Sequence, residues 1–69
     1  MTPAILRRLW SVVEATQAHT LLKLDDASLV QWLTNQTTNT TYLDGSQTDV
    51  LSDYIESRLT LIRDLAQER

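Results

Sequence analysis

Few side chains in this sequence are suited to chemistry. The chain has no cysteine and one histidine, His19, and a single histidine cannot form a metal cage or a catalytic pair by itself. Asp25 and Asp26 are adjacent carboxylates that could hold a cation or act as an acid and a base, but the start of a helix accounts for both residues. The sequence contains no nucleophile motif, phosphate-binding loop or metal-spaced cluster. We therefore expect no enzyme activity, no metal and no cofactor.

Arg58 is the polar residue whose position most needs an explanation. When residues 46–69 are wound at about 100° per residue, Arg58 lies near the centre of an apolar half of the helix. That half contains Leu51, Tyr54, Ile55, Leu59, Leu61, Ile62, Leu65 and Ala66. A guanidinium in such a stripe either extends along its own stem to water or meets a carboxylate. Extension to water is the simpler interpretation. The alternatives are a pair with Asp25, Asp26 or Glu14, or with a residue of a partner.

The tryptophans and the paired arginines have plain structural interpretations. Trp10 and Trp32 lie on different predicted helices, and tryptophan is common both in small cores and at binding interfaces. In so short a chain, a place in the core is the favoured interpretation for both. Arg7 and Arg8 fall on the outer face of the first helix, where solvated side chains are expected, although two positive charges could also contact a negatively charged surface.

The elements that position these residues are predicted to be helices. Thr2 followed by Pro3 is typical of a helix start, because proline at the first helical position loses no hydrogen bond. The first helix is expected at about residues 3–20. Asp25 is a good N-cap residue, and it predicts a second, shorter helix at about residues 26–35.

A polar loop and a long helix complete the prediction. Residues 36–45 combine threonine, asparagine and the chain's one glycine, a composition typical of a loop. Ser46 and Asp49 have the spacing of a capping box, and they predict a third helix at about residues 47–67. The expected fold class is therefore all-α, with two shorter helices and one long C-terminal helix in a single domain spanning residues 1–69.

The small size of the chain favours association. A 69-residue chain without disulfides or a metal can form only a small core, so oligomerisation is a natural source of extra stability. The apolar half of the third helix is wider than one neighbouring helix would cover. We therefore predict a helical-bundle homodimer, or a contact with a helix of another protein, through Leu51, Ile55, Arg58, Ile62 and Leu65.

Charge narrows the class of partner. Six Lys and Arg residues against nine Asp and Glu residues give a net charge of −3, which disfavours nucleic-acid binding. No segment resembles a signal peptide or a transmembrane helix, so we expect a cytoplasmic protein without membrane insertion. The predicted function is a protein–protein interaction module with an adaptor or regulatory role. The alternative is a small helix-turn-helix DNA-binding regulator, although its second helix would lack any Lys or Arg.

Overall fold

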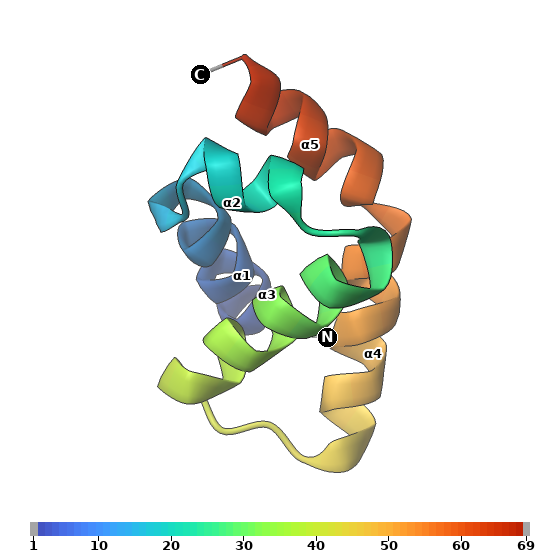
Figure 1. Ribbon diagram of the computed structural model, residues 1–69. Coiled ribbons are helices and arrows are strands. Elements are labelled where there is room, and N and C mark those ends of the chain that lie inside the picture. Colours follow the sequence, from blue (N-terminus) through green and yellow to red (C-terminus); the bar gives the residue numbers. More distant parts are fainter. Residues whose placement is uncertain (1, 69) are drawn as a thin grey trace.

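The computed structural model describes residues 2–68, apart from the side chain of Thr40, and all regular structure in that range is helical. The helices are α1 (Pro3–Ala15), α2 (Ala18–Lys23), α3 (Asp26–Thr40), α4 (Gly45–Ser57) and α5 (Leu59–Gln67) (Figure 1). The expectation of three helices was therefore wrong: the described chain has five. The structure is of one chain whose helices bury a core of their own, and it does not show the predicted homodimer.

The first predicted helix is two helices that meet at Thr16. As expected, Thr2 caps the start of α1, where its Oγ1 accepts a hydrogen bond from the backbone N–H of Ile5 at 3.3 Å. Thr16 is in an extended conformation (φ −83°, ψ 139°), and its hydroxyl donates to the carbonyl of Val12 at 2.6 Å. A hydroxyl that bonds to nearby backbone offers the chain an alternative to continuing the helix. The chain turns here, and α2 then places Leu21 in the core.

The second predicted helix is longer than expected, because α3 continues through most of the threonine-rich segment that was assigned to the loop. Thr34 and Thr37 are buried, and their hydroxyls donate to the carbonyls of Val30 and Leu33 at 2.8 and 2.9 Å. Threonine can therefore line the buried face of this helix, because its polar group is satisfied within the preceding turn. The loop that remains is only residues 41–44.

The residues that start α4 also differ from the prediction. The N-cap is Asp44, and not Ser46. A carboxylate oxygen of Asp44 accepts from the backbone N–H of Gln47 at 2.7 Å, while the side-chain oxygen of Gln47 accepts from the backbone N–H of Asp44 at 3.3 Å. This reciprocal pair is a capping box, and it lies two residues before the one inferred from Ser46 and Asp49.

The long C-terminal helix of the prediction is interrupted at Arg58. The hydroxyl of Ser57 donates to the carbonyl of Tyr54 at 2.7 Å, and the backbone N–H of Arg58 donates to the carbonyl of Ile55 at 2.9 Å. The backbone bond of Arg58 spans three residues instead of the four of an α-helix, so the turn is tightened. Arg58 leaves α-helical geometry (φ −115°, ψ 10°), and α5 begins at Leu59.

The five helices pack around one core. Helix α3 lies against both α1 and α4, while α5 packs on α2 and follows α4 (Figure 1). The described part of the chain measures 31 by 20 by 17 Å along its principal axes. Each helix contributes to the core, which consists of Ile5, Leu9, Val13, Leu21, Leu29, Leu33, Leu51, Ile55, Leu59, Ile62 and Ala66. Trp10 and Trp32 are partly buried and pack against this cluster.

Candidate protein-interaction surface

The wide apolar face of residues 46–69 divides into two stripes. The first stripe is buried in the core and consists of Leu51, Ile55, Leu59, Ile62 and Ala66. The second stripe runs beside it along α4 and α5 and consists of Val50, Tyr54, Arg58, Leu61 and Leu65. We call this second set the exposed stripe. Its aliphatic side chains are 40 to 47% exposed, and successive members are separated by four, four, three and four positions, the spacing of one helical face.

Aromatic contacts hold the middle of the exposed stripe. The guanidinium carbon of Arg58 lies 5.0 Å from the ring centroid of Tyr54, in a cation–π contact. The ring of Tyr54 in turn meets Trp10 of α1 edge to face, with centroids 6.5 Å apart and an interplanar angle of 86°. Arg58 also donates to the hydroxyl of Ser57 at 3.3 Å. The position of Arg58 is thus set by its neighbours while the residue itself is exposed.

Of the explanations considered for Arg58, extension to solvent agrees with the structure. Within residues 2–68, Arg58 forms no ion pair, and neither Asp25, Asp26 nor Glu14 contacts it through a salt bridge. The guanidinium donates to the Ser57 hydroxyl but meets no carboxylate in this range, so it can still pair with a carboxylate of a partner.

The residues predicted for an interface are placed on both stripes. Leu51, Ile55 and Ile62 are fully buried within the chain's own core, so they are not part of its surface. Arg58 and Leu65 belong to the exposed stripe. Val50, Tyr54 and Leu61 were not among the residues predicted for the interface, although their spacing relative to Arg58 and Leu65 is visible in the sequence. The sequence alone does not show which part of the apolar half the other helices cover and which part stays exposed.

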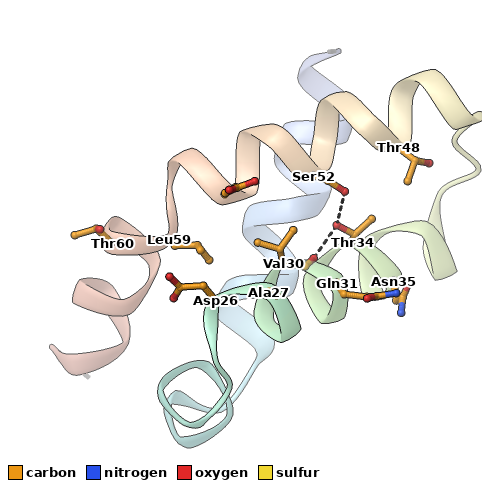
Figure 2. Close-up of a pocket in the computed structure, with 11 residues that line it drawn as sticks. Asp26, Ala27, Val30, Gln31, Thr34, Asn35, Thr48, Ser52, Leu59 and Thr60 are labelled. Atoms are coloured by element: carbon orange, nitrogen blue, oxygen red, sulfur yellow. Dashed lines mark hydrogen bonds between the residues drawn. The ribbon is translucent and has the colours of Figure 1, made fainter.

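A groove of about 760 Å³ lies on the other flank of α4, between α3 and the α4–α5 segment (Figure 2). Its apolar surface includes Ala27, Val30 and Leu59, and its carboxylates are Asp26 and Glu56. The hydroxyls of Thr34 and Ser52 lie 3.2 Å apart and join α3 to α4 across the groove. None of the residues that line the groove is a lysine or an arginine.

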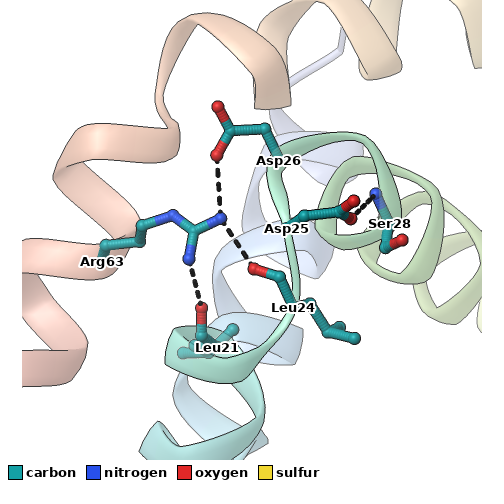
Figure 3. Close-up of polar contacts among 6 residues, drawn as sticks. All are labelled: Leu21, Leu24, Asp25, Asp26, Ser28 and Arg63. Atoms are coloured by element: carbon teal, nitrogen blue, oxygen red, sulfur yellow. Dashed lines mark hydrogen bonds and ion pairs between the residues drawn. The ribbon is translucent and has the colours of Figure 1, made fainter.

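Arg63 is the arginine that connects the helices (Figure 3). One of its terminal nitrogens donates to the carbonyl of Leu21 at 3.3 Å, and the other donates to the carbonyl of Leu24 and to a carboxylate oxygen of Asp26, both at 2.9 Å. Carbonyls at the end of a helix lack partners within the helix, and a planar guanidinium can satisfy two of them together with a carboxylate. Arg63 could not be singled out from the sequence, because it lies among polar residues.

The remaining candidate residues have structural roles or lie free on the surface. Asp25 is the N-cap of α3, as predicted, and Asp26 is the partner of Arg63. His19, Arg7 and Arg8 are exposed. Within residues 2–68, no cluster of three or more potential ligand side chains is arranged to hold a metal ion. None of the described helices is both long enough and apolar enough to cross a membrane.

The N-cap of α3 predicts a pH effect on stability. Hydrogen bonding from the Ser28 side chain and from its backbone N–H lowers the pKa of Asp25 below its ordinary value of 3.8. Figure 3 shows the bond from the backbone N–H, at 2.9 Å. A lowered folded-state pKa means that the ionised carboxylate stabilises the fold above the unfolded-state pKa, and that this contribution is lost as the pH falls through the folded-state pKa. Asp25→Asn keeps a capping oxygen but cannot titrate. We expect the free energy of unfolding to fall more for the parent chain than for Asp25→Asn as the pH is lowered below 3.8, measured by urea titration at each pH. Parallel plots of this free energy against pH for the two chains would contradict the prediction.

Comparison with known proteins gives no match to a family model, to a curated protein or to a solved structure. The chain's own surface is therefore the basis for the functional proposal.

Proposed function

We propose that this protein is a small interaction module, with an adaptor or regulatory role, that binds an amphipathic helix of a partner protein and catalyses no reaction. The partner helix lies along the exposed stripe of α4 and α5. The observation that carries the proposal is the exposure of Val50, Leu61 and Leu65, each at least 40% exposed, at helical spacing on either side of Arg58. A cytoplasmic location remains part of the proposal.

The chemistry of the exposed stripe specifies the partner. Val50 and Tyr54 lie on α4, Leu61 and Leu65 lie on α5, and Arg58 lies between the two helices, so the exposed stripe extends over several helical turns. Helix-recognition surfaces commonly bind apolar anchors at intervals of three and four residues, and the exposed stripe offers apolar side chains over a comparable length. Arg58 lies between the apolar ends, and its positive charge favours a carboxylate opposite it. The expected partner is therefore a helix with an apolar face and an Asp or Glu near its middle.

The residue types also favour a protein partner. Tyr and Arg are over-represented among the residues that dominate binding energy, and Trp10, Tyr54 and Arg58 form a connected set here. Tyr54 is held by Trp10, so it loses little freedom when a partner binds. A nucleic-acid partner has less support, because α3, the second helix of the supposed DNA-binding pair, has no Lys or Arg.

Site-resolved crosslinking tests this proposal. A photoreactive amino acid at Leu61 is expected to form an adduct, in cells that produce the protein, with a partner segment that has apolar residues at helical spacing and an acidic residue. The same group at Leu22 provides a matched control, because Leu22 is 40% exposed but lies on α2. Arg58→Glu should reduce the Leu61 adduct without changing helix content. Identical adducts from both positions, or an adduct only with another copy of the chain, would refute the proposal.

A further inference from the structure

The groove between α3 and α4 differs in charge from the exposed stripe on the opposite flank of α4. It contains two carboxylates and no basic residue in its lining, whereas the charged member of the exposed stripe is Arg58. The two surfaces therefore suit ligands of opposite charge. This second surface is independent of the proposed function, because none of its lining residues belongs to the exposed stripe.

The carboxylates of the groove are not equivalent. Arg63 donates to one oxygen of Asp26 from outside the lining, so part of that charge is already compensated. Glu56 is exposed and makes no ion pair with any other residue in the range 2–68. Glu56 and Leu59 both line the groove, on either side of the turn at Arg58, and Leu59 lies near Asp26 in Figure 2.

The hydroxyl groups of Thr34 and Ser52, which meet across the groove, already have hydrogen-bond partners. The Thr34 hydroxyl, on a residue only 6% exposed, donates to the carbonyl of Val30 and meets the Ser52 hydroxyl. A ligand that lies over them therefore does not have to supply hydrogen bonds to this part of the groove. The available attractions are apolar contact with Val30 and Leu59 and the charge of the carboxylates.

We propose that this groove binds a lysine or arginine side chain presented by a segment of a different protein. Long basic side chains have an apolar stem and a charged head, and they commonly pack the stem on apolar surface while the head reaches a polar edge. Here the stem lies over Val30 and Leu59, and the head meets Glu56 with Asp26 beside it. Charge complementarity selects this occupant over an acidic or neutral segment.

The test uses two synthetic helical peptides and NMR of the full chain. One peptide contains leucine, alanine and lysine, with the lysines beside its apolar face, and the other has glutamine at every lysine position. The lysine peptide is expected to shift the backbone amide signals of Val30, Glu56 and Leu59, all of which line the groove. Glu56→Gln should weaken this binding about two- to fivefold, the effect typical of an exposed charge pair.

Asp53→Asn is the matched control variant. Asp53 is also an exposed acid on α4, but it does not line the groove, so both variants remove the same charge from the same helix. Asp53→Asn is expected to bind the lysine peptide with the same affinity as the parent chain, within experimental error. Equal weakening by both variants, equal binding of both peptides, or shifts confined to Leu61 and Leu65 would overturn the inference. Concentration-dependent shifts in the groove without peptide, abolished by Arg58→Glu, would assign the groove to a second copy and likewise overturn the inference.

Discussion

Leu51→Ala is expected to destabilise the fold by about 2 to 5 kcal/mol, whereas Leu61→Ala should cost about 1 kcal/mol or less. Both leucines belong to the apolar half of residues 46–69, and both substitutions leave a good helix former in place. Leu51 is fully buried and Leu61 is 44% exposed. Only the first substitution therefore leaves a cavity. A chain of this size has a total stability of roughly 3 to 10 kcal/mol, so Leu51→Ala should remove a large share of that stability.

Urea unfolding followed by circular dichroism would measure both values. The difference between the two variants is the informative quantity, because the residue change is the same in each. Similar destabilisation by both substitutions would mean that the apolar half of the helix is not divided into a buried and an exposed stripe, and it would remove the structural basis of the proposed function.

Arg63→Met is expected to cost about 1 to 3 kcal/mol, whereas Arg58→Met should cost about 1 kcal/mol or less. Loss of the Arg63 guanidinium leaves the carbonyls of Leu21 and Leu24 without their donor and removes the ion pair to Asp26. These charge-assisted bonds join α5 to the α2–α3 connection, and the Arg63 side chain is only 23% exposed. Arg58 forms its cation–π contact at the surface.

Arg63→Lys provides a finer test of the same contacts. An ammonium group can replace the charge but not the planar arrangement of donors that reaches both carbonyls and the carboxylate. Thermal and urea unfolding should therefore place Arg63→Lys between the parent chain and Arg63→Met. Equal stability of Arg63→Met and Arg58→Met would show that the connection through Arg63 does not stabilise the fold.

The helix starts that depend on a single local signal were predictable from the sequence. Thr2 before Pro3 and Asp25 both cap helices where they were expected to do so. Each signal consists of a side chain that bonds to a backbone N–H within one turn, so it does not depend on the rest of the fold. Ser46 illustrates the weakness of such signals, because Asp44 with Gln47 makes the better capping box two residues earlier.

The helix ends were less predictable, because they depend on how hydroxyl groups bond to the backbone. Thr16 and Ser57 each donate to a preceding carbonyl where a helix stops. Thr34 and Thr37 make similar bonds inside α3, where the helix continues and the threonines face the core. The same local bond therefore accompanies either outcome, and packing against α1 and α4 distinguishes them.

Two members of the exposed stripe, Arg58 and Leu65, were predicted from the sequence as interface residues. The width of the apolar face and the prominence of Arg58 came from periodicity alone. Periodicity could not show which stripe the other helices cover, because that depends on the turn at Arg58 and on the packing of α5 against α2. For the same reason Arg63 was missed, since its three partners lie 37 to 42 positions away in the sequence.

A charge exchange across the proposed interface tests the function most directly. Calorimetry would measure the affinity of the partner segment mapped by crosslinking for the parent chain and for Arg58→Glu. We expect Arg58→Glu to weaken binding by about tenfold or more, and a lysine in place of the partner's acidic residue to restore much of the loss. Unchanged affinity for Arg58→Glu, or no recovery with the lysine-substituted segment, would contradict a role for the exposed stripe in binding an acidic helix.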